Sequence, residues 1–365
     1  MFVPAILLVL FLLNSFVPKE KDAEEKAPEE IKYLAGMALR DKLIDSFRTA
    51  SVAKADKNKS GLENIVFKST DGGQTWQDIS KGLPENLLED GFERDGYFAN
   101  ESGLYLRAAN GIYHNKPNSS ASLWTKENFS GEQGSIAPGK NRMFAYNYKG
   151  QFAQKTMGTG VWSPIYKDVK AKGLHTVIET VRGTVIIGSE NGIFKSTNSG
   201  KTWKQVHTGG WVMKLAESNG VLLATSQNGI LRSTDNGENW VTVISEGGVG
   251  IDVERIRGGF AAISYNTLMK SRRIHISLDG GQSWKIVGNG LQPYLNFSST
   301  DELPPSMGIS SIKQVGEYLL CGHPDGIYRS SDMGKTWKLL LPSVDNKVFN
   351  LSVSGNVIYA IPRPG

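Results

Sequence analysis

The chain has 365 residues, a formal net charge of +5 and one cysteine, Cys321. One cysteine excludes an internal disulfide framework and any multi-cysteine zinc or iron–sulfur site, and five scattered histidines argue against a His-rich metal site. The charge is small, and no Lys/Arg-rich block interleaved with aromatics indicates nucleic-acid binding. We therefore expect no cofactor, no metal and no nucleic-acid partner.

The N-terminal residues 1–18 are strongly apolar, with an uninterrupted apolar run over residues 2–13. This run is shorter than the ~20 residues of a membrane-spanning helix and fits the ~7–15 residues of a signal-peptide core. No Lys or Arg precedes it, and no clear small-residue cleavage site follows it. We expect a signal peptide, with an uncleaved membrane anchor as the alternative. Either interpretation predicts an exported protein that is periplasmic, secreted or on the cell surface.

Residues 19–60 form a separate segment. Residues 19–30 are dense in mixed charge, and Pro28-Glu29-Glu30 is typical of the start of a helix, with proline first and acids in the first turn. We expect a charged, partly helical linker that could serve as a stalk. Plain disorder is the alternative interpretation.

One phrase, Ser-x-Asp-x-Gly-x-x-Trp, recurs five times after residue 60, with asparagine once at the acidic position. The acidic or amide residue and the tryptophan of the five copies are Asp71 and Trp76, Asn198 and Trp203, Asp235 and Trp240, Asp279 and Trp284, and Asp332 and Trp337. Two decayed copies ending at Trp124 and Trp162 fill the gap between the first and second clear ones. A period of ~40–50 residues is typical of propeller blades.

The residues around each phrase predict four short strands. In the fifth unit we expect strands over residues 211–217, 221–225, 229–233 and 240–244, with Asn228-Gly229 as a turn before the third. Before the first copy there is only one strand, over residues 64–68. After the last complete unit, the C-terminus provides two further strands, over residues 348–354 and 357–361.

These strands predict an all-β, seven-bladed β-propeller over residues 61–365. Its blades are four-stranded and antiparallel, and strands from both chain ends share one blade. Closing the ring in this way removes exposed sheet edges.

The repeated phrase has a structural interpretation. The aspartate can accept backbone N–H bonds from two residues on, glycine supplies a positive φ, and the serine hydroxyl adds another backbone bond. The tryptophan begins the outer strand and packs between neighbouring elements. Repeated turns lie around a rim, whereas a catalytic site needs different residues at one point. We therefore assign the aspartates and tryptophans of the phrase to the scaffold.

The phrase resembles the Asp-box, or bacterial neuraminidase repeat, over residues 61–365. Families that share it include sialidases, xyloglucan-cleaving glycosidases, sortilin-type receptors, photosystem II assembly factors and secreted exo-sialidase-like propellers. In its build, this chain looks most like the assembly-factor and receptor types. The resemblance implies a non-enzymatic extracytoplasmic propeller that binds or assembles a protein or a glycan through its top face.

The alternative is a glycoside hydrolase of the sialidase type, which would be an enzyme. Sialidases hold a substrate carboxylate with three arginines and carry an Arg-Ile-Pro motif before the first Asp box. Nothing like that motif stands between Ser60 and Asp71. Arg255-Ile256-Arg257 is similar but comes late and lacks the proline, and Arg232 and Arg329 fall in third strands beside Asp boxes. Xyloglucan-cleaving enzymes use a cleft between two propellers, and this chain holds one.

A propeller usually binds ligands at one end of its central channel. The expected first strands place His175, Glu179, Trp211, Lys214, Asp252, Glu254, Arg255 and Lys313 there, either as a site or as the lining of a wet channel. The long connection over residues 287–309 adds Tyr294 and Phe297, for binding or for local packing. We assign no catalytic residue, and propose as binding candidates His175, Glu179, Trp211, Lys214, Arg255, Tyr294 and Phe297. The partner is an unspecified protein or glycan, the ring is expected to be monomeric, and the N-terminus could tether it to a membrane.

Overall fold

The structure is a computed structural model that describes residues 64–84, 87, 95–108, 111–117, 123–127, 129, 134–157, 160–165, 170–245, 248–268, 271–288, 291, 308–343 and 348–363. The expected signal peptide or anchor (1–18), the linker (19–60), Tyr294 and Phe297 lie outside these residues. Within them, no helix is both long and apolar enough to cross a membrane.

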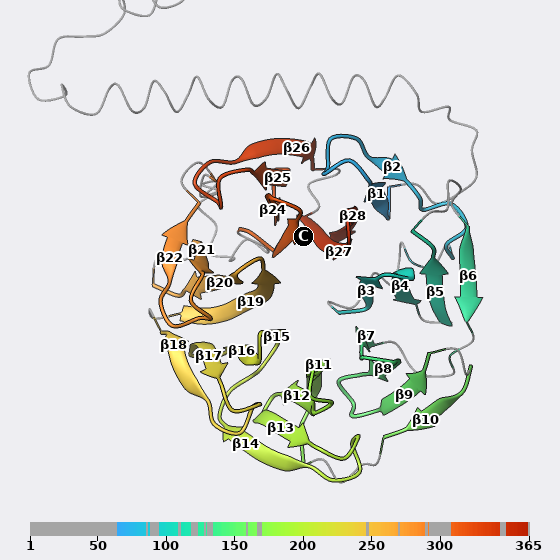
Figure 1. The fold of residues 1–365 in the computed structure, drawn as a ribbon. Coiled ribbons are helices and arrows are strands. Elements are labelled where there is room, and N and C mark those ends of the chain that lie inside the picture. The colour runs from blue at the N-terminus through green and yellow to red at the C-terminus, as the bar shows by residue number, and fades with distance from the viewer. Residues whose placement is uncertain are drawn as a thin grey trace, which may run out of the picture. The chain divides into compact units, whose positions relative to one another are not determined.

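The described strands form seven four-stranded antiparallel sheets arranged as blades around a central channel (Figure 1). This confirms the predicted seven-bladed propeller. The first three blades after the N-terminal strands are β3 (Tyr97–Asn100), β4 (Gly103–Ala108), β5 (Gly111–Asn115) and β6 (Trp124–Glu127); β7 (Ser135–Pro138), β8 (Arg142–Tyr146), β9 (Phe152–Thr156) and β10 (Trp162–Pro164); and β11 (Leu174–Glu179), β12 (Val185–Ser189), β13 (Gly192–Ser196) and β14 (Lys204–Thr208).

Three further blades are also built from consecutive strands, and in each the lowest-numbered strand lines the channel (Figure 1). They are β15 (Leu215–Ser218), β16 (Val221–Ser226), β17 (Gly229–Ser233) and β18 (Val241–Ile244); β19 (Gly248–Ile256), β20 (Gly259–Asn266), β21 (Ser271–Ser277) and β22 (Lys285–Val287); and β23 (Ser311–Val315), β24 (Tyr318–His323), β25 (Gly326–Ser330) and β26 (Lys338–Pro342).

The seventh, closing blade joins the two ends of the described chain. Its order is β2-β1-β28-β27, from β1 (Phe67–Ser69), β2 (Gln77–Asp78), β27 (Val348–Ser354) and β28 (Val357–Arg363). β1 and β28 pair antiparallel, with Phe67 opposite Ala360. The predicted closure of the ring by two strands from each end is therefore confirmed.

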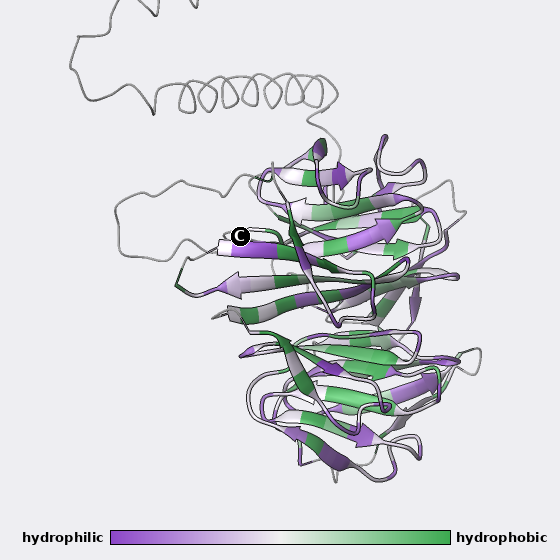
Figure 2. Ribbon diagram, turned by 60° about the vertical axis from the view of Figure 1, so that its left-hand side comes forward, coloured by the Kyte–Doolittle hydropathy of each residue, from purple (hydrophilic) through white to green (hydrophobic). Residues whose placement is uncertain are grey.

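The second strand of a blade is buried on both faces because another blade packs on each side. In β16, Leu222, Leu223 and Ala224 are all 0% exposed. In the sequence, such a strand is a continuous run of apolar residues rather than an alternation of apolar and polar residues. Figure 2 shows the hydrophobic residues concentrated along the strands inside the ring. The core is thus a series of apolar layers between blades.

Two predicted strand boundaries in the fifth unit were wrong. Residues 211–214 precede β15, because the backbone N–H groups of Met213 and Lys214 donate to the Thr225 hydroxyl at 3.2 and 2.9 Å. Trp240 precedes β18, since its indole N–H donates to the Gly237 carbonyl at 3.1 Å and keeps the ring inside the Asp-box turn. The other four clear Asp-box tryptophans likewise stand just before the outer strand.

The Asp box is a closed hydrogen-bonded turn. Asp71 Oδ1 accepts the backbone N–H groups of Gln74 and Thr75 at 2.9 and 3.0 Å, so the bonds reach three and four residues on rather than the predicted two. The Ser69 hydroxyl donates to Asp71 at 2.8 Å and accepts the N–H of Gly73 at 2.9 Å, as predicted. All of these side-chain roles are local to the turn.

Each box needs two successive residues with positive φ, and glycine holds the second position. In the first box, Gly72 and Gly73 have φ of 71° and 87°. A Cβ on Gly73 would lie 2.7 Å from Cδ1 of Leu340 in the adjacent blade. Glycine is therefore required both for the turn and for packing the turn against the neighbouring blade.

The box carboxylates remain ionised because they accept several hydrogen bonds. At Asp332, bonds from the hydroxyl and backbone N–H of Thr336 and from the Ser330 hydroxyl lower the pKa to about 2. Asn198 keeps the same turn without a charge, and its Oδ1 accepts the N–H of Thr202 at 2.9 Å. The carboxylates therefore have a structural part in the fold.

Candidate functional site

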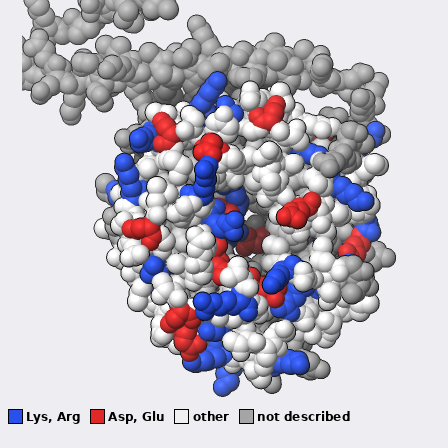
Figure 3. All heavy atoms as spheres, in the orientation of Figure 1, with Lys and Arg blue, Asp and Glu red and all other residues white. Residues whose placement is uncertain are grey.

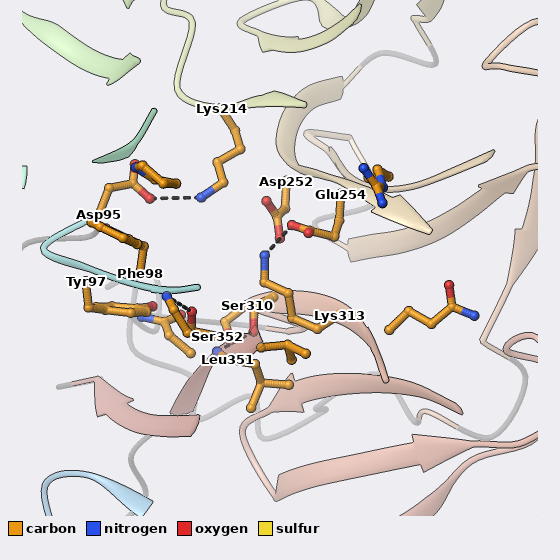
Figure 4. Close-up of a pocket in the computed structure, with 17 residues that line it drawn as sticks. Asp95, Tyr97, Phe98, Lys214, Asp252, Glu254, Ser310, Lys313, Leu351 and Ser352 are labelled. Atoms are coloured by element: carbon orange, nitrogen blue, oxygen red, sulfur yellow. Dashed lines mark hydrogen bonds and ion pairs between the residues drawn. The ribbon is translucent and has the colours of Figure 1, made fainter. Parts of the chain in front are cut away.

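The channel contains a pocket of about 340 Å³ between the inner strands of several blades (Figure 4). Five of the residues that the sequence placed on first strands line it together: Lys214, Asp252, Glu254, Arg255 and Lys313. Asp252 and Glu254 alternate along β19 and so face the same side, and the ring brings them close to Lys313 of β23 and to Lys214 and Arg255. The sequence analysis missed other lining residues, among them Asp95, Tyr97, Ser310, Asn350 and Ser352.

An ion pair crosses the channel. Lys214, just before β15, reaches Asp95, just before β3, with 3.0 Å between Nζ and Oδ1 (Figure 4). The two blades lie on opposite sides of the ring (Figure 1). Burial by itself lowers the pKa of Lys214, but the carboxylates of Asp95, Asp252 and Glu254 outweigh burial and raise it. Lys214 is therefore charged and links two blades across the channel.

Three other ionisable groups that line the pocket, Asp252, Glu254 and Lys313, also have partners. Lys313 forms an ion pair with Glu254 of the adjacent blade, and Asp252 Oδ2 accepts the N–H of Ile312 at 3.4 Å. Among the described residues that line the pocket, three side chains are acidic and three are basic. Figure 3 shows both signs of charge mixed around the central opening. This balance gives the pocket no net preference for an anion or a cation.

Arg255 lines two cavities. It lies in the channel pocket and also in a second hollow of about 430 Å³, formed near the first turns of adjacent blades by Ser218, Asn219, Arg257 and Gly316 among others. Among the described residues of the channel pocket, Arg255 is the one arginine. The described lining thus lacks the three-arginine arrangement of a sialidase carboxylate site.

Glu179, another candidate, does not line this pocket. Its Oε2 accepts bonds from Nε of Arg142 at 3.1 Å and from the backbone N–H of Lys140 at 2.8 Å, and its side chain is 8% exposed. Arg142 belongs to β8 and Glu179 to β11, so the pair holds two blades together. This partner could not be predicted from the sequence, because the two residues are 37 positions apart.

His175 and Trp211 lie at the end of the ring opposite the Asp boxes. Because strands alternate in direction, the turns between second and third strands and the links between blades share one face, which we call the top face. His175 contacts the ring of Tyr148 in the β8–β9 turn, with centroids 5.8 Å apart. Trp211 stands in the link before β15 and is 54% exposed.

Among the described residues, no group of three or more His, Cys, Asp or Glu side chains could hold a metal ion. Cys321 is fully buried, which raises the pKa of its thiol. In the described part of the chain, the candidate residues thus lie in the channel and on the top face, apart from Glu179.

A ring of four-stranded blades with these turns defines an Asp-box β-propeller. Two family models of the repeat match the chain: a BNR/Asp-box repeat at residues 67–78 and a BNR-Asp box repeat at residues 327–340. The chain therefore carries Asp-box repeats at these residues on a seven-bladed propeller fold, as the sequence resemblance implied. No curated protein matches the sequence.

Several solved structures share the fold. YCF48 bound to a D1 peptide is 15% identical, with a TM-score of 0.51 over 72% of this chain and 91% of that one. An ancestral GH74 enzyme is 13% identical, with a TM-score of 0.52 over 74% and 43%. The extracellular domain of a B. thetaiotaomicron protein described as a one-component system is 10% identical, with a TM-score of 0.51 over 71% and 35%. The chain thus spans about a third of that domain, and at these identities the likeness shows the fold.

Proposed function

We propose that this protein is a non-enzymatic binding or assembly propeller outside the cytoplasm, which recognises a protein or a glycan through its top face. The observation that carries the proposal is the pairing of acids with bases. Asp95 is bound to Lys214, Glu254 to Lys313 and Glu179 to Arg142. A general acid or base must be able to reach a proton of the substrate, and each of these carboxylates is already held by a cation of the chain.

The top face supports a binding role. Its turns and links carry exposed large aromatic side chains, among them Tyr148 and Trp211, on a rigid ring. Such loops on a stable scaffold are the usual place for recognition residues. Export is part of the same proposal and rests on the apolar N-terminal run.

A photo-crosslinking amino acid at position 211 tests the proposal. We expect it to capture a partner in the native cell envelope, whether protein or glycan. Position 181 is the matched control, because Val181 is 69% exposed and lies in a first turn on the opposite face. Gel shifts with protein and glycan staining measure the products. Equal capture from both positions, or capture from position 181 alone, would contradict recognition through the top face.

A glycoside hydrolase is the second candidate, favoured by one observation. Asp252 and Glu254 lie two residues apart on β19, and both line the channel pocket. Two carboxylates in one pocket are what glycoside hydrolysis requires. We still rank this candidate below binding, because Lys313 neutralises Glu254.

Hydrolysis assays separate the two candidates. We expect fluorogenic sialosides and xyloglucan to show no turnover above the uncatalysed rate. The variants Glu254→Gln and Asp252→Asn are prepared alongside Arg257→Met, an exposed control outside the channel pocket. Turnover by the native protein that drops at least about 100-fold in Glu254→Gln, but persists in the control, would establish an enzyme instead.

A further inference from the structure

The top face beside the β11–β14 blade carries an aromatic and basic patch, formed by Tyr148, Lys149, Lys170, Lys172, His175 and Trp211. Tyr148 is 59% exposed and Trp211 is 54% exposed, and the three lysines are exposed as well. Among the described residues, the third large exposed aromatic is Tyr318, whose ring is covered by the Arg329 guanidinium. Exposed tyrosine and tryptophan are therefore concentrated in this patch.

Direct contacts join the parts of the patch. The Tyr148 hydroxyl donates to the Glu190 carboxylate, and the Glu190 N–H donates to the Lys172 carbonyl at 2.9 Å. On the other side of Glu190, the carbonyl of Ser189 accepts the N–H of Val212 at 3.0 Å, which places Trp211 next along the surface. The patch is thus one continuous surface across the end of a blade.

The backbone holds these side chains in place. A Cβ on Gly173 would lie 2.7 Å from Cε2 of Tyr148, so the chain that carries Lys172 packs closely against the tyrosine ring. Gly209 and Gly210, with φ of 108° and 73°, set the direction of the link that presents Trp211. Preorganised aromatic rings lose little conformational entropy when a ligand stacks on them.

The charge of the patch favours an anionic ligand. Among the described residues, the patch holds three lysines and one glutamate, Glu190, and that glutamate already accepts the Tyr148 hydroxyl. The patch consists of turns at the ends of strands, so it offers ring faces and ammonium groups rather than the backbone groups of a sheet edge that an extended peptide would pair with. The C–H face of a sugar ring can stack on tyrosine and tryptophan while its acidic groups meet the lysines.

We propose that this patch binds an acidic polysaccharide that carries carboxylate or sulfate groups. The inference rests on the proposed binding function and names its ligand class. Recognition then takes place on the outer part of the top face. The channel pocket, in which acidic and basic side chains balance, is a separate site.

Affinity electrophoresis of the full-length protein tests this inference with four probes. They are heparin for sulfate groups, polygalacturonate for carboxylates, neutral dextran, and poly-glutamate as an acidic peptide. We expect retardation by heparin, polygalacturonate or both, weaker retardation by poly-glutamate, and none by dextran. Because the lysines are exposed, the binding should weaken as salt is raised from about 50 to about 300 mM.

Variants connect the binding to the patch. Trp211→Ala and the double variant Lys170→Glu/Lys172→Glu should each weaken binding by about tenfold or more, whereas Trp211→Phe should retain most of it. Leu268→Ala is the matched control, because Leu268 is 86% exposed in a top-face turn of another blade. Circular dichroism verifies that each variant is folded.

Two results would overturn the inference. One is the absence of retardation by both acidic polysaccharides at low salt. The other is binding that persists in Trp211→Ala or that poly-glutamate matches, which would indicate unspecific attraction between charges. Either result leaves the proposed function open to its own test, because crosslinking from position 211 can still report a protein partner.

Discussion

Deletion of residues 348–365 is expected to abolish the folded ring. The deletion removes β27 and β28, whose side chains Phe349, Leu351, Ile358 and Tyr359 are at most 2% exposed. Burying each such side chain contributes about 1.5–3 kcal/mol, so about 6–12 kcal/mol is lost. That loss is comparable to the whole stability of a typical domain, about 5–15 kcal/mol. The truncated chain should show no cooperative thermal transition by circular dichroism.

The reason for so large an effect is the shared blade. Without β28, β1 loses one of its two strand partners and keeps only the short β2, and the inner strands β3 and β23 lose the contacts that they make with β27. Strands without a neighbour expose the edge of a sheet, and exposed edges promote aggregation, which size-exclusion chromatography would detect. A peptide of residues 344–365, added in trans, should restore part of the transition. Deletion of residues 364–365 is the control. A truncated chain that melts as the intact protein does would show that closure is dispensable.

The fold could be predicted because each blade repeats the same local chemistry. The Asp-box turn requires its serine, acid or amide, glycine and tryptophan at fixed spacing, so five copies marked five blades directly. Trp124 and Trp162 marked the other two, although their indole N–H groups bond to the Ile79 carbonyl and the Glu127 carboxylate instead of a box glycine. Strand ends were less predictable, as Trp211 and Trp240 show, because side-chain hydrogen bonds decided them.

The candidate site was only partly predictable. Residues on inner strands could be placed in the channel from their position in the repeat, which is why Lys214, Arg255 and their neighbours were found together. Partners from other blades could not be anticipated, since Asp95 is 119 positions from Lys214. Of the patch around Tyr148, His175 and Trp211 were among the predicted candidates. Its lysines were missed because Lys149 lies in the β8–β9 turn, Lys170 and Lys172 lie in the link before β11, and the three form no block in the sequence.

The second large effect is expected for the ion pair between Lys214 and Asp95, which crosses the channel. Lys214→Met keeps the length of the side chain but leaves Asp95, whose side chain is 15% exposed, without its cation. Breaking a buried ion pair costs about 3–5 kcal/mol. The Lys214 side chain is 29% exposed, and access of water reduces the expected cost to about 2–3 kcal/mol. For a domain of this size the Tm should fall by about 5 °C.

Two comparisons isolate the cause of that loss. Asp95→Asn in the Lys214→Met background removes the uncompensated charge, so it should recover part of the Tm. Arg257→Met breaks the pair with Glu317, whose side chains are 72% and 76% exposed, and should change stability by less than about 0.5–1 kcal/mol. If Lys214→Met lowered the stability no more than Arg257→Met does, the Lys214–Asp95 ion pair would be a solvated contact in a water-filled channel. The measured difference between the two therefore decides whether Lys214 holds opposite blades together or is available to a ligand.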